Sequence, residues 1–232
     1  MNDTLYHIGL SILSTVYDTG AAHTMGDGHR GGMEHQRLRI EARRILSLLE
    51  GRLLEEDEID KEAQARPFFP SRAVDYNIAH SGVLTAVSYV KGKNLRTGCD
   101  VEWIRPRARA GKIAENFYSA PEKSYVFPQG AFDETRFYEI WALKKCFLRL
   151  RGLSVFNISA CQSFISDEGA FAFGAAVPSA LSFWLYHLSG PMGERSVLAT
   201  ALEGKEQKPP EIRWFSHLSL TDKKTAEIKA AP

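Results

Sequence analysis

The sequence contains few of the features that a disulfide-bonded or zinc-binding protein requires. Its three cysteines, among 232 residues, are Cys99, Cys146 and Cys161. They are too few and too scattered for a disulfide framework or a zinc site. The scarcity of cysteine favours a reducing compartment, and we therefore expect the protein to be cytoplasmic.

An excess of charge of either sign is also missing. Twenty-nine Lys and Arg residues face 28 Asp and Glu residues, which gives a formal net charge of +1. Bulk charge therefore gives no reason to expect a nucleic acid or a membrane surface as a partner. The hydrophobic fraction of 44% and the charged fraction of 25% are ordinary for a globular protein, which excludes wholesale disorder. The length suits one large domain or two small ones.

Long hydrophobic runs are absent as well. The longest uncharged run, residues 169–193, contains four glycines and two prolines. A membrane helix needs about 20 mostly apolar residues, so this run predicts two strands with a turn at Pro178. The first 18 residues lack a basic lead and a small-residue cleavage site, and they predict a strand over residues 5–16 rather than a signal peptide.

The hydrophobic periodicity predicts a mixture of helices and strands. Apolar residues recur at helical spacing over residues 36–54, 110–117 and 135–150. Strands are expected over residues 5–16, 74–79, 83–90, 98–103, 153–165, 170–177, 181–188 and 196–202. A loop is expected over residues 18–32, and a partly irregular tail from about residue 204.

A strong helix followed by several strands occurs twice along the chain. This order predicts an α+β fold of two similar halves, residues 1–97 and residues 98–232. A site between two such halves would be a natural place for a ligand.

Two carboxylates stand out in the strand over residues 98–103. Asp100 and Glu102 are two residues apart, so they point to the same face of the strand. They offer the oxygen ligands that Mg²⁺ prefers when it binds beside substrate phosphates. The alternative is an exposed edge strand with two solvated acids.

Three further groups of residues could bind an anion. His80 and Ser81 lie in a turn at a strand end, where they could meet a phosphate or where the histidine could take a proton. Lys144 lies within the apolar stripe of the helix over residues 135–150, with Lys145 and Arg149 on its flank, and a cation in that place must snorkel or find an anion. The arginine face of the first helix is either solvated or a further anion site; it comprises Arg37, Arg39, Arg43 and Arg44.

Five motifs in this order resemble those of the 4′-phosphopantetheinyl transferases, in particular their larger, pseudo-dimeric class. That family shows K-P, N-x-S-H-S, G-x-D-x-E, F-F-x-x-x-E and W-x-x-K-E-[SA]-x-x-K. The corresponding segments here are Arg66-Pro67-Phe68, Asn77-Ile78-Ala79-His80-Ser81-Gly82, Thr97-Gly98-Cys99-Asp100-Val101-Glu102, Asn116-Phe117-Tyr118-Ser119-Ala120-Pro121-Glu122 and Trp141-Ala142-Leu143-Lys144-Lys145-Cys146-Phe147-Leu148-Arg149. The resemblance covers about residues 36–155.

The resemblance implies two subdomains related by a pseudo-twofold axis, each a helix packed on a small antiparallel sheet. It implies that coenzyme A and Mg²⁺ bind between them, and that phosphopantetheine is transferred from coenzyme A to a serine of an acyl or peptidyl carrier protein. We expect a monomer that uses neither nucleic acid nor a membrane.

The resemblance also implies a role for single residues. Asp100 and Glu102 would bind the metal, and Glu122 would hold water or act as a base. His80, Ser81, Lys144 and Arg149 would contact the phosphates of coenzyme A, with His80 also catalytic. Arg66 would lie near the adenine nucleotide, and Arg37 or Arg39 would meet the 3′-phosphate.

One residue departs from the family pattern at the centre of the site. Lys145 stands where the family has the glutamate that completes the metal site and is a candidate base. Exchanging a negative for a positive charge should weaken the binding of a divalent metal, because unit charges about 4 Å apart interact by about 4 kcal/mol at an effective dielectric of 20. The ammonium group could itself neutralise Asp100 and Glu102.

Three interpretations therefore stay open. The first is an active transferase with an unusual metal site in which Lys145 takes part. The second is a non-catalytic homologue that binds coenzyme A or a carrier protein. The third is an unrelated α+β binding protein.

Overall fold

The architecture is known from a computed structural model. It describes residues 5–12, 27–54, 60–61, 67–68, 74–82, 84–161, 163–165, 171–173, 181–189, 194–204 and 209–215. Among the helices of these ranges, none is long and apolar enough to cross a membrane.

The first unit of the fold is a four-stranded sheet with one long helix. From the first part of the chain it contains β1 (Leu5–Ile12), α1 (Asp27–Glu50), β4 (Val74–Ser81) and β5 (Leu84–Lys91). β5 lies between β1 and β4 and is antiparallel to both. The late strand β11 (Glu211–Phe215) joins the outer side of β1 in parallel. α1 packs on this sheet through an apolar face that includes Ile45 and Leu46, both fully buried.

The second unit repeats this arrangement. β6 (Arg96–Trp103) is followed by α2 (Ala110–Phe117), α3 (Ala120–Val126), the short η2 (Pro128–Gly130), α4 (Glu134–Arg151) and η3 (Val155–Ala160). β9 (Leu181–Ser189) and β10 (Arg195–Glu203) then complete a three-stranded antiparallel sheet in the order β6-β10-β9. Two small ladders pair β2 (Asp60–Lys61) with β3 (Pro67–Phe68) and β7 (Ser163–Ile165) with β8 (Phe171–Phe173).

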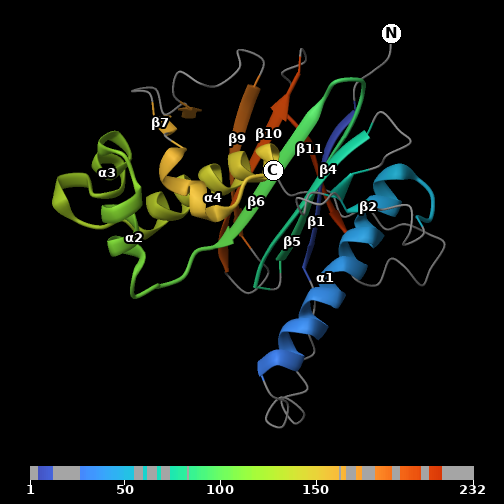
Figure 1. The fold of residues 1–232 in the computed structure, drawn as a ribbon, viewed down its shortest axis with the longest axis horizontal. Coiled ribbons are helices and arrows are strands. Elements are labelled where there is room, and N and C mark those ends of the chain that lie inside the picture. Colours follow the sequence, from blue (N-terminus) through green and yellow to red (C-terminus); the bar gives the residue numbers. More distant parts are fainter. Residues whose placement is uncertain are drawn as a thin grey trace.

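Both units therefore share one topology. In each, a strand, a long helix and two further strands follow in order, and the last strand lies in the middle of the sheet. This confirms the predicted α+β fold of two similar halves, in which β5 corresponds to β10. Figure 1 shows the two sheets at the centre, with α1 beside one and α2, α3 and α4 beside the other. The division of the chain at residue 97 stays a prediction.

The two sheets share a core and meet along β4 and β6. Apolar residues from both units form this core, among them Leu10, Val90, Val101 and Leu198, each fully buried. The hydroxyl of Tyr6 on β1 also donates to the carbonyl of Ala201 on β10, at 3.1 Å.

β4 and β6 are joined by hydrogen bonds that involve side chains, rather than by a backbone ladder. The backbone N–H groups of Thr97 and Cys99 donate to Asp75 Oδ2 at 2.7 Å and to Asn77 Oδ1 at 3.3 Å. Further along, the N–H of Trp103 donates to Ser81 Oγ at 3.0 Å. Each bond joins a residue of β4 to the residue 22 positions later, so the two strands run in the same direction in a fixed register.

Asn77→Ala should destabilise the protein by about 1–3 kcal/mol, because the N–H of Cys99 would then be buried without an acceptor. Urea unfolding followed by circular dichroism measures the loss. Asn116→Ala, at an exposed position within α2, is the matched control. A change of equal size in both variants would contradict the role of Asn77 in joining the sheets.

Several local predictions were wrong, each for a physical reason. α1 begins at Asp27, where a loop was predicted, because Gly31 and Gly32 weaken the local helical signal. The strand predicted over residues 153–165 contains instead η3, which starts where the side chain of Ser154 accepts a hydrogen bond from the N–H of Phe156. The predicted irregular tail contains β11, whose partner β1 lies about 200 residues away.

α3 was not predicted, although its sequence carries a start signal. Ser119 and Glu122 have the spacing of a capping box, with Pro121 in the first turn. The backbone N–H of Ser119 donates to Glu122 Oε2 at 2.7 Å. The strands predicted on either side of Pro178 are present as β8 and β9, while Pro178 itself lies outside the described residues.

Candidate functional site

The centre of the candidate site is the face of β6 that is covered by α4. Asp100 and Glu102 lie on this face, as their spacing predicted. The side chain of Asp100 is completely buried, and that of Glu102 is 14% exposed. Two carboxylates held this close together in a partly buried place require a positive partner.

Lys145 of α4 supplies that partner. Its ammonium nitrogen lies 3.1 Å from Asp100 Oδ1 and 2.5 Å from Glu102 Oε1. The contact that the sequence predicted between this lysine and the two carboxylates is therefore confirmed.

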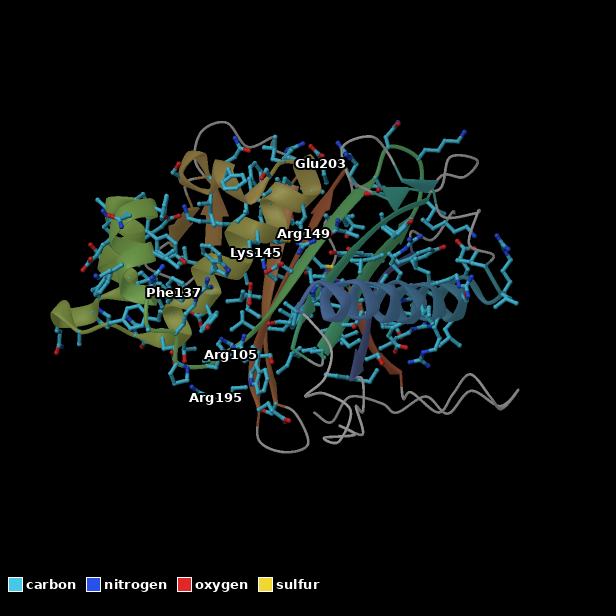
Figure 2. The ribbon with its side chains drawn as sticks, turned by 60° about the horizontal axis from the view of Figure 1, so that its bottom comes forward. Arg105, Phe137, Lys145, Arg149, Arg195 and Glu203 are labelled. Carbon is cyan, nitrogen blue, oxygen red and sulfur yellow. The ribbon has the colours of Figure 1, made fainter. Side chains whose placement is uncertain are left out.

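Arg149, one turn further along α4, binds the same carboxylate and reaches across to the other unit. Its Nε lies 3.1 Å from Asp100 Oδ1, and its Nη1 donates to the carbonyl of Ile78 on β4 at 3.0 Å. Figure 2 shows Lys145 and Arg149 next to each other on α4. The sequence analysis did not predict that Arg149 would bridge the two units.

Burial and charge act against each other at this cluster. Burial raises the pKa of Asp100 to about 6, although Lys145 and Arg149 act to lower it. Burial alone would lower the pKa of Lys145, but Asp100 and Glu102 outweigh it and raise this pKa above its ordinary value. At neutral pH Asp100 is therefore mainly a carboxylate, and Lys145 is protonated. Asp100 Oδ2 is buried and has no hydrogen-bond donor among the described residues.

The predicted turn at the end of β4 lies beside the carboxylates. The hydroxyl of Ser81 donates to Glu102 Oε2 at 3.3 Å, and His80 is exposed one residue before it. Gly82 allows this turn, because its φ is +58° and a Cβ there would lie 2.6 Å from the Trp103 ring. Ser81, Asp100, Glu102, Lys145 and Arg149 thus form one contact network, which we call the β6–α4 cluster.

Lys144 and Glu122 form a separate, buried ion pair. Lys144 Nζ lies 2.9 Å from Glu122 Oε2, and both side chains are completely buried. The same ammonium donates to the carbonyls of Ile158, at 3.3 Å, and Cys161. The ammonium of Lys144 is thus bonded to groups inside the protein, and its contact with a coenzyme A phosphate stays a prediction. Glu122 is likewise enclosed, and it contacts Lys144 and the N–H of Ser119, so its role as a base stays a prediction.

The arginines predicted to meet the nucleotide are not brought to the cluster by any described contact. Arg39 is exposed on α1. The side chain of Arg37 and the whole of Arg66 lie outside the described residues. Arg44 is not part of a solvated face, as it is buried and pairs with Glu41 at 2.6 Å.

The residues of the β6–α4 cluster do not fit the Mg²⁺ that the resemblance implies. Mg²⁺ requires oxygen ligands at about 2.0–2.1 Å in octahedral geometry. Asp100 and Glu102 offer such oxygens, but both already hold the ammonium of Lys145. Among the described residues, no group of three or more His, Cys, Asp or Glu side chains could hold a metal ion.

Comparison with known proteins points to one family. Residues 96–201 match the family model described as the 4′-phosphopantetheinyl transferase superfamily. The chain is 33% identical over 98 residues to the 4′-phosphopantetheinyl transferase psf-1 of Bacillus pumilus, over 40% of this chain and 39% of that protein. It is 30% identical over 110 residues to the 4′-phosphopantetheinyl transferase AcpT of Escherichia coli K12, over 46% of this chain and 54% of that protein.

A third relative is a putative 4′-phosphopantetheinyl transferase of Haemophilus influenzae, 24% identical over 117 residues, which are 50% of this chain and 49% of that protein. The chain thus spans about half the length of the curated relatives that it matches. The matched family region, residues 96–201, contains β6, α4 and most of β10, and so all of the β6–α4 cluster except Ser81. Through this region, the chain is similar to the 4′-phosphopantetheinyl transferase superfamily.

Proposed function

We propose that the protein transfers 4′-phosphopantetheine from coenzyme A to a serine of an acyl or peptidyl carrier protein. The serine oxygen forms a bond to the phosphorus next to pantetheine. The bond between that phosphorus and the bridging oxygen of the diphosphate breaks. Adenosine 3′,5′-bisphosphate leaves, and the serine hydroxyl loses its proton. In such a phosphoryl transfer, the protein acts mainly by positioning the reactants and by neutralising charge.

The observation that supports this proposal is the cationic edge of the β6–α4 cluster. Asp100 is completely enclosed, whereas Lys145 and Arg149 are 19% and 34% exposed. An anion that approaches the cluster would therefore meet ammonium and guanidinium N–H groups first. A guanidinium carries five N–H donors and suits a diphosphate. His80 and Ser81, beside this edge, remain candidates for contacts to the same phosphates.

The other parts of the proposal follow from the resemblance. We propose that Arg37, Arg39 and Arg66 serve the adenine nucleotide, and that the protein acts in the cytoplasm as a monomer without nucleic acid or membrane. We assign Lys144 and Glu122 as positioning residues, because their ion pair ties α4 to the start of α3.

A second function is favoured by Lys145 itself. A homologue that has lost the metal-site glutamate could bind coenzyme A or a carrier protein without transferring anything. The two functions agree on binding and differ in turnover, so both must be measured on the same preparation.

Coenzyme A should bind with a dissociation constant in the micromolar range, on the order of −8 kcal/mol. Arg149→Ala should weaken it by roughly 10- to 100-fold, the loss expected for hydrogen bonds between charged groups. Calorimetry measures this affinity. Arg151→Ala is the control, since Arg151 lies on the same helix but pairs with Glu203 at 2.9 Å. Equal affinities in the two variants would contradict the placement of the diphosphate.

Mass spectrometry of an apo-carrier protein incubated with coenzyme A and this protein tests transfer. A gain of one phosphopantetheine group per carrier supports the transferase. Tight binding of coenzyme A without any gain, across acyl and peptidyl carriers, would instead establish the non-catalytic homologue.

A further inference from the structure

The formal charge of the β6–α4 cluster differs from that of the family pattern in a specific way. Asp100 and Glu102 are negative, and Lys145 and Arg149 are positive, so these four side chains sum to zero without any ion. In the pattern that the chain resembles, a glutamate and a lysine stand at positions 145 and 149. That set has three carboxylates and one cation, and its charge of −2 is what one divalent metal ion balances.

We propose that Lys145 is a built-in replacement for the divalent metal, and that the protein binds the diphosphate of coenzyme A and transfers phosphopantetheine without such a metal. This inference rests on the proposed function for the transfer step, but not for the exclusion of the metal. With Lys145 in place, the cluster has the same net charge as the metal-loaded pattern of the family. Its attraction for an anion is therefore retained rather than lost.

The geometry of Lys145 supports this substitution. Its nitrogen contacts one oxygen of each carboxylate, at 3.1 Å and 2.5 Å, and so occupies the space between the two carboxylates. A metal ion at about 2 Å from these oxygens would collide with the ammonium and be repelled by it. The lysine and the metal are therefore mutually exclusive at this place.

The cationic edge is also held rigidly. Lys145 and Arg149 are four residues apart, so they lie on one face of α4. α4 is pressed against β6 at Gly98, where an added Cβ would lie only 2.8 Å from the carbonyl oxygen of Cys146. Charges that are fixed before the reaction lower its barrier without the cost of reorganisation.

Hydrogen-bond donors remain available for the diphosphate. An ammonium has three N–H groups, and Lys145 directs contacts to two carboxylates. Arg149 contacts Asp100 through Nε and the Ile78 carbonyl through Nη1. As the serine oxygen bonds to phosphorus, the charge that develops on the departing bisphosphate would lie against these two cations. The serine proton passes to solvent or to the departing bisphosphate, so no further reactant is required.

The first experiment measures metal binding, which does not depend on turnover. Wild-type protein, Lys145→Glu and the charge-matched control Lys112→Glu, at an exposed position on α2, are titrated with Mn²⁺ and followed by electron paramagnetic resonance. We expect Lys145→Glu to bind Mn²⁺ at least about 100-fold more tightly than the other two. Equal affinity in all three proteins would overturn the proposal, as would tight Mn²⁺ binding by the wild type.

The second experiment measures coenzyme A affinity and transfer in EDTA and in Mg²⁺. Wild-type values should be the same in both, whereas Lys145→Glu should lose about 100-fold in EDTA and recover in Mg²⁺. A wild type that needs Mg²⁺ would overturn the proposal. The wild type could show no transfer while Lys145→Glu is the only one of the three proteins to bind Mn²⁺. In that case the proposed function and the metal-free transfer both fail, and only the exclusion of metal by Lys145 stands. Thermal unfolding shows that each variant is folded.

Discussion

Lys144→Ala should cost about 3–5 kcal/mol in the free energy of unfolding, a loss large enough to unfold a marginal protein. Lys144 and Glu122 are completely buried and lie 2.9 Å apart. Removing the ammonium leaves the Glu122 carboxylate buried without its counter-charge, and the carbonyls of Ile158 and Cys161 lose their donor. An uncompensated buried charge is far more costly than a lost surface ion pair.

Urea unfolding of a matched set measures this effect. Lys123→Ala, at a partly exposed position next to Glu122, should change stability by less than about 0.5 kcal/mol. The double variant Lys144→Met/Glu122→Leu should recover the part of the loss that comes from the uncompensated charge, although the carbonyls of Ile158 and Cys161 stay without their donor. If Lys144→Ala were as stable as the double variant, the expected cost of the unpaired Glu122 carboxylate would be contradicted.

The double variant also separates two roles of Lys144. If Lys144 only positions α4 against α3, the folded double variant keeps its affinity for coenzyme A. If Lys144 contacted a phosphate, as the family resemblance implied, the affinity would fall although the protein is folded. We expect the first result, because the contacts of the Lys144 ammonium to Glu122, Ile158 and Cys161 are all inside the protein.

Gly98→Ala should lower stability by about 1–3 kcal/mol and reduce coenzyme A affinity together with it. A Cβ at Gly98 would lie 2.8 Å from the Cys146 carbonyl oxygen and 3.0 Å from Leu150 Cβ. The first of these neighbours is backbone, so α4 itself must move away from β6. Lys145 and Arg149 would move with α4, and their contacts to Asp100 would lengthen.

Gly111→Ala is the control for this substitution. Its Cβ would lie 3.8 Å from Phe132 Cδ2, an ordinary contact, and the residue is within α2. Alanine suits a helix better than glycine, so we expect no loss or a small gain in stability. The measurements are urea unfolding and calorimetry with coenzyme A. Unchanged stability of Gly98→Ala would show that the sheet and α4 can part without cost, and would contradict a rigid cluster.

Much of the site could be read from short-range patterns. The two-residue period of a strand places Asp100 and Glu102 on one face, and the helical period places Lys145 and Arg149 on one side of a helix. Both statements hold in the structure. The family resemblance then joined these two faces, since it implied that residue 145 reaches the carboxylates. These predictions succeeded because backbone geometry fixes side-chain directions within one element.

The roles of the two adjacent lysines could not be assigned in this way. The sequence placed both cations toward a polyanion, but only Lys145 contacts the site carboxylates, while Lys144 turns to Glu122 on α3. The partner of Lys144 depends on how α3 packs against α4. Nothing in the sequence around Lys144 encodes that packing, and α3 itself went unrecognised despite its Ser119 and Glu122 start signal.

The sequence alone determined the strand and helix periods, the repeated helix-and-strand order, the family motifs and the inverted charge at Lys145. Only the tertiary structure decided that β11 pairs with β1, that β4 and β6 are joined by the side chains of Asp75, Asn77 and Ser81, and that Arg149 spans from Asp100 to the carbonyl of Ile78. The physical reason is the distance along the sequence over which each effect acts. Periodicity and capping act over a few residues, whereas these contacts join segments 22 to about 200 residues apart, and they form only when burial of the shared core brings the two sheets together.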